Sequence, residues 1–357
     1  MNPRYNFAPG PAMLPQEVLQ RVKDELFDWQ GTGVSVMEVG HRTSDFQNML
    51  ANVEHKIRQL MSIPSTYKIL FLPGGAQGQF DAVPLNLTRK NKKANYFVTG
   101  IWSERAAKYA NKYAQVHLVT ETLPTGMPDE TLWHIPSDAA YTYYCSNETI
   151  NGIRFPTLPK TNTPLVVDMT SSILAEHIGI EQFGIIFASA QKNLGIAGIT
   201  LVIVREDLLE QSLEVVPEVF NYKVQAQINS CLNTIPTFPL YVMDLMLDWL
   251  IDKGGVATME HLSQKKSEKL YQCIDNSDGF YVNKVGKKYR SLCNVPFDLP
   301  TDTLLQTFLE QADNHHLMNL KGHQLGGGAR ASLYNAMPEA GVEQLVDFMQ
   351  DFAAQHA

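Results

Sequence analysis

Short apolar runs alternate with segments of helical periodicity through the first two thirds of this chain, and this alternation is what most limits the possible folds. Apolar residues predominate in the segments 68–72, 94–98, 115–119, 140–145, 164–167, 184–189 and 199–204, and they are uninterrupted at 69–72, 164–167 and 201–204. Strands with that pattern are buried on both faces, as in a mostly parallel sheet that is covered by helices. We therefore predict an α/β fold.

Helical periodicity is visible at 15–29, 44–61 and 102–113, between or before the predicted strands. The pattern changes at about residue 256, after which helices are expected at 257–274 and 301–315.

Short strands are expected between those last two helices, in the stretches FYVNK and SLCNVPF, and a final helix follows Pro338. This mixture is typical of a smaller α+β domain. We predict a large domain over 16–256 and a small domain that combines 1–15 with 257–357.

The charge of the chain argues against two classes of partner. With 29 Lys and Arg against 37 Asp and Glu, the formal net charge is −8, which would repel nucleic acid and anionic membranes. No run of about 18 apolar residues is present, and the first residues lack the basic flank and apolar stretch of a signal peptide. We expect a cytoplasmic protein that binds neither nucleic acid nor membrane.

The four cysteines, Cys145, Cys231, Cys273 and Cys293, are widely spaced. None forms a CxxC motif or has an adjacent histidine, so we predict no metal site. We interpret them as reduced thiols that mostly serve packing.

Residues that could bind a ligand follow four of the predicted strands. They are Gly74–Gln77, Trp102, Asp168 and Lys192. Ligands of open α/β sheets bind at the carboxyl ends of the strands, so these residues are candidates for one site. Each also has a simpler interpretation: a tight turn, core packing, a helix cap and a solvated surface lysine, respectively.

Asp168 and Lys192 together favour the functional interpretation, because they follow successive strands. A lysine that forms a Schiff base and a carboxylate that keeps a heteroaromatic nitrogen protonated are the two groups of a pyridoxal phosphate site. The glycines before a helix would hold the phosphate through backbone amides.

At these residues the sequence resembles the phosphoserine aminotransferases, within the class V branch of the fold-type I pyridoxal-phosphate enzymes. The resemblance covers essentially the whole chain, through eight segments in family order: YNFAPGPAMLP, GHRTSDF, LFLPGGAQGQF, YYCSNETINGI, VVDMTSS, ASAQKNLG, CLNTIPTF and GGGARASLYNA. It implies the fold-type I architecture, with a large domain and a smaller α+β domain.

The resemblance also implies the role of each cofactor residue. Lys192 would form the Schiff base, Asp168 would pair with the ring nitrogen, Trp102 would stack on the ring, and Thr149 would donate to its phenolate oxygen. The phosphate would be held by the following groups: the amides of Gly75, Ala76 and Gln77, the Gln191 side chain, and Asn233 and Thr234 of the neighbouring subunit. A homodimer with shared active sites is therefore expected.

By the same resemblance, the substrate site maps onto His41, Arg42, His323 and Arg330. Arg330 would bind the α-carboxylate, and the other three would face the substrate phosphate, since arginine forks suit both anions. The family often has arginine where this chain has Gln324, which removes one positive charge from the expected pocket.

The implied reaction moves the amino group of L-glutamate to 3-phosphohydroxypyruvate, which gives O-phospho-L-serine and 2-oxoglutarate. The pyridoxine precursor 3-hydroxy-2-oxo-4-phosphooxybutanoate is a second possible acceptor. Two alternatives remain open from the residues alone: another class V enzyme such as a cysteine desulfurase, which needs a reactive thiolate, and a non-catalytic protein that keeps the fold for binding.

Overall fold

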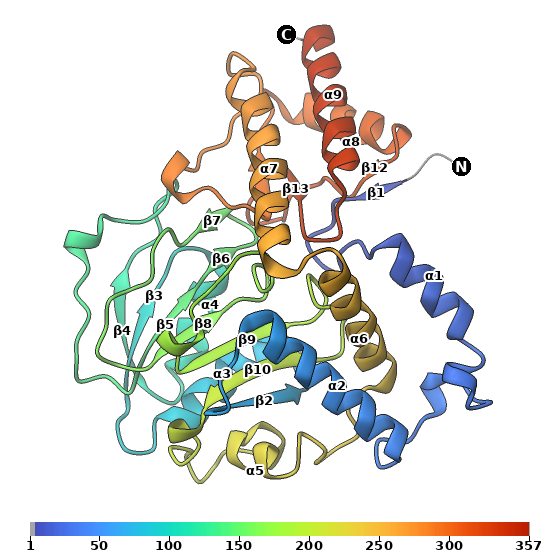
Figure 1. Ribbon diagram of the computed structural model, residues 1–357. Coiled ribbons are helices and arrows are strands. Elements are labelled where there is room, and N and C mark those ends of the chain that lie inside the picture. Colours follow the sequence, from blue (N-terminus) through green and yellow to red (C-terminus); the bar gives the residue numbers. More distant parts are fainter. Residues whose placement is uncertain (1–3, 357) are drawn as a thin grey trace.

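A computed structural model describes residues 4–356 of the chain (Figure 1). Its main sheet has seven strands in the order β2-β10-β9-β8-β5-β3-β4. Strand β10 runs antiparallel to both of its neighbours, and the remaining pairs are parallel. The predicted mostly parallel sheet of an α/β fold is confirmed.

The strands have these bounds: β1 Tyr5–Asn6, β2 Tyr67–Leu72, β3 Lys93–Phe97, β4 Gln115–Thr120, β5 Tyr141–Cys145, β6 Asn147–Glu148, β7 Ile153–Arg154, β8 Leu165–Asp168, β9 Ile185–Ser189, β10 Thr200–Arg205, β11 Asn294–Phe297, β12 Leu317–Met318 and β13 Ala329–Ser332. The α-helices have these bounds: α1 Gln16–Glu25, α2 Ser44–Met61, α3 Gly75–Leu87, α4 Ile101–Ala110, α5 Tyr222–Gln227, α6 Thr237–Asp252, α7 Gly255–Asp275, α8 Asp302–Asn314 and α9 Glu339–His356.

Helices cover both faces of the main sheet. Successive residues of β2 point to opposite sides, so that Ile69 and Phe71 belong to a core shared with α2 and α6, whereas Leu70 and Leu72 belong to a core shared with α3 and α4. Figure 1 shows α2 and α6 together on the near side of the sheet. This two-sided burial explains why the strands appear in the sequence as continuous apolar runs.

A separate apolar cluster lies beside the sheet layers and is formed largely by residues after 269. Helices α7 and α9 lie side by side there (Figure 1), and β11 pairs antiparallel with β13. The N-terminal segment joins this cluster, because Tyr5 and Phe7 are buried in it and β1 pairs with β12. We propose on this packing that the N-terminal segment belongs to the small domain, as predicted.

The structure differs from the sequence-based prediction in three places. The stretch 280–284 is not a strand: its only pairing is the isolated bridge of Val282 with Asp298, because the Asn283 side chain bonds the backbone at Pro296 and Val285. Helix α1 ends at Glu25 rather than near Trp29.

Helix α6 has no counterpart in the prediction. It is buried on most sides, so its sequence lacks the polar face that marks a helix.

The carboxyl ends of β2, β9, β8, β5 and β3 lie at one edge of the sheet, because these strands run in the same direction. That edge is where the fold places polar residues for ligand binding. Among residues 4–356, no helix combines the length and the apolar character required to cross a bilayer.

Candidate active site

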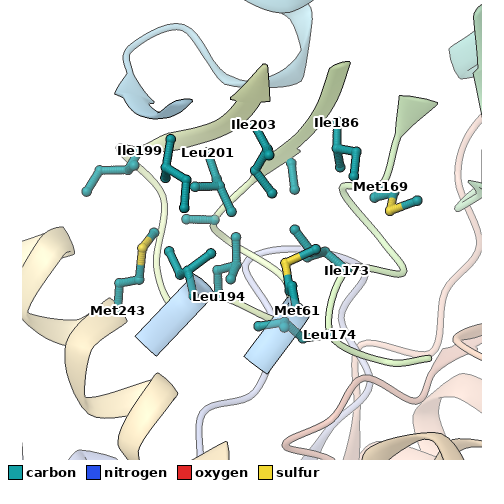
Figure 2. Packing of buried hydrophobic residues seen from close by; sticks show 14 of the residues in the cluster. Met61, Met169, Ile173, Leu174, Ile186, Leu194, Ile199, Leu201, Ile203 and Met243 are labelled. Carbon is teal, nitrogen blue, oxygen red and sulfur yellow. The ribbon is translucent and has the colours of Figure 1, made fainter. Parts of the chain in front are cut away.

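Lys192 lies three residues after the end of β9, in a segment anchored by apolar packing. Figure 2 shows the neighbouring Leu194 and Ile199 in a cluster with residues of β9 and β10. The lysine is only 8 % exposed, and its Nζ donates a hydrogen bond of 2.5 Å to Oγ1 of Thr149. Burial lowers the pKa of Lys192 to about 8, although the nearby Asp168 carboxylate opposes this shift.

Asp168 is the last residue of β8, where the backbone register pairs it with Cys145 on one side and Phe187 on the other. It is buried, and its Oδ1 accepts a hydrogen bond of 2.8 Å from the Thr170 amide. Burial raises the pKa of this carboxyl, while the bonds from Thr170 and the charge of Lys192 lower it. A buried carboxylate of this kind is suited to hold a proton on a ligand nitrogen.

A cavity of about 330 Å³ lies between these two side chains and the surrounding strand ends, a size typical of small-molecule sites. It is lined by Pro9, Gly10, Gly74, Gly75, Ala76, Gln77, Trp102, Cys145, Asn147, Thr149, Ile150, Asp168, Thr170, Ser171, Ser189, Gln191, Lys192, His323 and Arg330. Within residues 4–356, no three His, Cys, Asp or Glu side chains are grouped so that they could hold a metal ion.

The N-terminus of α3 opens into this cavity without a side-chain cap. Gly74 and Gly75 precede and begin the helix with φ values of 93° and 65°, which glycine adopts without strain. The first amides of α3, including those of Ala76 and Gln77, have no partner within the helix. An uncapped helix N-terminus beside glycines is suited to bind a phosphate.

Two residues that line the cavity each have a buried polar atom without a protein partner. Trp102, at the start of α4, has an unbonded indole Nε1, and Arg330, on β13, has an unbonded Nε. Arg330 is 4 % exposed as a residue, and its guanidinium makes one long hydrogen bond, 3.4 Å from Nη1 to the Thr149 carbonyl. Burial lowers the pKa of Arg330, and a buried cation without a partner favours an anionic ligand.

His323 also reaches the cavity, from the loop that precedes β13. Its Nδ1 accepts a hydrogen bond of 3.2 Å from the Leu325 amide, which leaves Nε2 available to a ligand. Gln324, the next residue, is exposed and lies outside the cavity.

Four residues of the predicted site do not line this cavity: His41, Arg42, Asn233 and Thr234. They form a second group, in which Oγ1 of Thr234 lies 3.1 Å from Nδ1 of His41. Arg42 and Asn233 are exposed. A single chain therefore brings ten of the predicted residues together and leaves these four apart.

Several cavity residues were not expected from the sequence. Pro9 and Gly10 form part of the wall, and a Cβ at Gly10 would lie 3.3 Å from Cγ of Gln191. The stretch APGPA was the available signal, since adjacent glycine and prolines mark a fixed turn. Cys145 was interpreted as a packing residue, and it is buried but also lines the cavity.

A comparison with protein families decides the classification. The family model described as "Aminotransferase class-V" matches residues 4–345. The chain belongs to this family. As a class-V aminotransferase it has the family and fold that its sequence predicted.

Individual class-V aminotransferases are similar to this chain along its full length. Phosphoserine aminotransferase of Laribacter hongkongensis (strain HLHK9) is 47 % identical over 355 residues, which are 99 % of each chain. A PLP-bound phosphoserine aminotransferase from Trichomonas vaginalis has a TM-score of 0.94 and 37 % identity, covering 98 % of this chain and 100 % of that one. Phosphoserine aminotransferase from Bacillus circulans subsp. alkalophilus has a TM-score of 0.96 and 37 % identity, with both chains covered in full.

Proposed function

We propose that this class-V aminotransferase is a pyridoxal-phosphate-dependent phosphoserine aminotransferase. It transfers the amino group of L-glutamate to 3-phosphohydroxypyruvate and so produces O-phospho-L-serine and 2-oxoglutarate. The observation that carries the proposal is the buried Lys192 beside Asp168 and Arg330, in a cavity at the strand ends. Full-length identity to proteins with this activity supports the choice of substrates.

The cavity residues fit the cofactor. The uncapped start of α3 suits its phosphate, the Asp168 carboxylate suits its ring nitrogen, and the partly buried indole of Trp102 suits its ring face. Bound pyridoxal phosphate would supply an electron sink for the substrate Cα. Gln191, whose side chain accepts a hydrogen bond of 2.5 Å from Ser189, adds a polar group at the phosphate end.

Lys192 is the group that moves the proton. Its pKa of about 8 leaves an appreciable neutral fraction near neutral pH, so that Nζ can attack a carbonyl and take a proton from the substrate Cα. Thr149 orients this Nζ through their hydrogen bond. Asp168 keeps a proton at the ring nitrogen, because a nearby carboxylate favours the cationic form.

Arg330 and His323 supply the anion recognition within one chain. The buried guanidinium of Arg330 has unused donors for the α-carboxylate that glutamate and the keto acid share. His323 lies on the loop before β13, and its Nε2 can donate a hydrogen bond to the phosphate of the keto acid. Arginine is suited to this role because its planar fork matches a carboxylate.

The second group of predicted residues supports a homodimer. His41, Arg42, Asn233 and Thr234 lie outside the cavity of their own chain, and we propose that they complete the cavity of a partner subunit. Exposed apolar side chains flank them in the sequence, among them Met37, which is 57 % exposed. Exposed apolar surface beside a polar group is typical of a subunit interface.

Mixed dimers test this arrangement. The Lys192→Ala and Arg42→Ala proteins should each be nearly inactive. When equal amounts exchange subunits after mild denaturation, half of the dimers contain one chain of each kind, and each of these has one intact site out of two. The mixture should therefore recover about a quarter of the wild-type activity. No recovery in a preparation shown to contain mixed dimers would mean that Arg42 acts within its own chain.

A desulfurase needs a reactive thiolate, which burial opposes at three of the four cysteines, and the half-buried Cys231 does not line the cavity. Burial raises the pKa of Cys145 well above its usual range, and it raises those of Cys273 and Cys293 to about 11 and about 12. The four cysteines form no disulfide, which suits a reducing compartment. We propose a cytoplasmic location on that ground.

Two measurements test the activity. The purified protein incubated with pyridoxal phosphate should show a visible absorbance band, and borohydride reduction should attach the cofactor to the peptide that contains Lys192. In a separate sample that has not been reduced, L-glutamate alone should release one 2-oxoglutarate per loaded site. Failure of either step would refute the proposal, and a steady-state comparison of 3-phosphohydroxypyruvate with 3-hydroxy-2-oxo-4-phosphooxybutanoate would rank the two acceptors.

A further inference from the structure

A second buried carboxylate lies next to the active site without lining the cavity. Glu148 is fully buried, and both of its oxygens accept hydrogen bonds from the first turn of α4. Oε1 accepts from the amide and the hydroxyl of Ser103, at 2.8 and 2.6 Å, and Oε2 accepts from the amide of Trp102, at 3.0 Å. These contacts satisfy amides that a helix cannot bond internally.

The neighbouring residues leave little freedom to this arrangement. A Cβ at Gly100, the residue before α4, would lie only 2.6 Å from Cδ of Glu148, so the carboxylate sits directly against the backbone. The amide of Ile101 donates to Oδ1 of Asn151, at 3.3 Å. The start of α4 is therefore held by two side chains of the β6–β7 segment (147–154), Glu148 at the end of β6 and Asn151 in the turn, and by a negative charge that complements the helix dipole.

This segment and this helix each contribute a wall of the cavity. Thr149, directly after Glu148 in the chain, accepts the hydrogen bond from Nζ of Lys192. Trp102, whose amide is bonded to Glu148, lines the cavity with its indole. One carboxylate thus connects the residue that orients the lysine with the aromatic ring at the other side of the site.

The N-termini of α3 and α4 differ in whether they are free to bind an anionic ligand. The start of α3 is uncapped and opens to the cavity, whereas the start of α4 is occupied by Glu148. An anionic ligand is therefore directed to α3 and excluded from α4, where a carboxylate already neutralises the amides.

We propose that Glu148 is a positioning residue that fixes the Trp102 indole and the Thr149 hydroxyl relative to each other and so sets the width of the cofactor slot. This inference rests on the proposed function, in which these two residues contact the cofactor ring. Glu148 touches neither substrate nor cofactor. Its effect reaches the site through the backbone of α4 and of the β6–β7 hairpin.

The test compares Glu148→Gln with wild type in cofactor-free and cofactor-bound protein. Glutamine keeps the shape but turns one acceptor into a donor that faces an amide, which should weaken pyridoxal phosphate binding about tenfold to a hundredfold in a titration of the cofactor-free protein. The absorbance maximum of the bound cofactor should shift, because the slot around the ring changes. Glu148→Asp keeps the charge but withdraws it by one methylene, and should show an intermediate loss.

Fluorescence gives a measure that does not depend on the cofactor. Subtracting the emission of a Trp102→Phe protein from that of its Trp102 parent isolates the Trp102 signal from the other tryptophans. Glu148→Gln should change this difference signal in cofactor-free protein. In a double variant with Trp102→Phe, the loss in cofactor affinity should be smaller than the sum of the two single losses.

Glu176→Gln is the matched control for a general weakening of the hairpin. Glu176 is a partly buried carboxylate outside the cavity that pairs with Arg154 on β7. This variant should lower the melting temperature and leave the cofactor affinity and the Trp102 signal as in wild type.

Unchanged cofactor affinity and Trp102 emission in Glu148→Gln would overturn the inference, as would equal losses of affinity in Glu148→Gln and Glu176→Gln. If Glu148→Gln does not fold, the Asp variant decides by the same two measures. A wild-type protein that binds no pyridoxal phosphate would refute the proposed function instead, and the Trp102 signal would still test whether Glu148 positions the indole.

Discussion

Replacing Lys192 by methionine should stabilise the cofactor-free protein at neutral pH. Methionine has a similar length and no charge, so it removes the buried cation and keeps most of the packing. The pKa of Lys192 falls from 10.5 in an ordinary lysine to about 8 in the fold. A difference of that size means that the folded state loses about 3 kcal/mol wherever the lysine is charged in both states.

The free-energy penalty for burying the charged Lys192 should decrease as the pH rises. Below pH 8 the amine is protonated in the folded and the unfolded protein, and the whole penalty is present. Between pH 8 and pH 10.5 the folded protein loses the proton while the unfolded chain keeps it, so the penalty declines as the pH rises. Above pH 10.5 both states are neutral and the penalty is absent.

The substitution also removes the hydrogen bond from Lys192 to Thr149, which contributes about 1 kcal/mol. We therefore expect Lys192→Met to be about 2 kcal/mol more stable than wild type at pH 7 and about 1 kcal/mol less stable above pH 10.5. Urea unfolding of both cofactor-free proteins, at one protein concentration and at a series of pH values, measures the difference. Lys90→Met, at an exposed lysine, controls for the substitution itself.

A stability difference between wild type and Lys192→Met that stays constant from pH 7 to pH 10.5 would refute this reasoning. The amine would then titrate in the folded protein as it does in the unfolded chain. The argument that Lys192 is partly neutral near physiological pH would lose its basis, and activation of the amine would have to come from the bound cofactor.

Three further predictions concern other positions. Asp168→Asn should lower kcat by more than tenfold, because a neutral amide cannot stabilise a protonated ring nitrogen, and stopped-flow measurement of the glutamate half-reaction checks this. Gln324→Arg should change the KM for 3-phosphohydroxypyruvate by no more than about fivefold, since the side chain is exposed and lies outside the cavity; a larger fall in KM would mean that the loop folds inward. Gly152→Ala should destabilise by about 1–3 kcal/mol in urea unfolding, because its Cβ would lie 2.4 Å from Cδ of Pro296. Gly279→Ala, also at positive φ but in open space, should cost less.

The sheet and its functional edge were predictable because two independent signals agree there. Continuous apolar runs marked strands that are buried on both faces, and the residue types after them differ sharply from the runs. Asp168 and Lys192 are charged residues placed where the fold buries everything around them. A charge in such a place is retained for chemistry more often than for stability.

Periodicity could not predict the parts of the site that depend on distant pairing. Pro9 and Arg330 come from opposite ends of the chain and reach one cavity only because β1 pairs with β12 and β13 pairs with β11. The stretch APGPA indicated a turn at Pro9, but neither its place in the cavity wall nor the anion-binding role of Arg330 follows from periodicity. Glu148 had no signal either, since a glutamate within a polar turn is ordinarily exposed.

The pairing of β2 has a consequence for how the chain folds during synthesis. Strand β2 ends at Leu72, and its partner in the sheet, β10, begins at Thr200, so the early strand emerges from the ribosome long before it can pair. Strand β1 stays unpaired for even longer during synthesis, because its partner β12 begins at Leu317. Contacts of such long sequence separation slow folding and leave apolar edges exposed meanwhile. We therefore expect β2 to stay unpaired until β10 has been synthesised, and the cavity to be completed only once Arg330 has joined it.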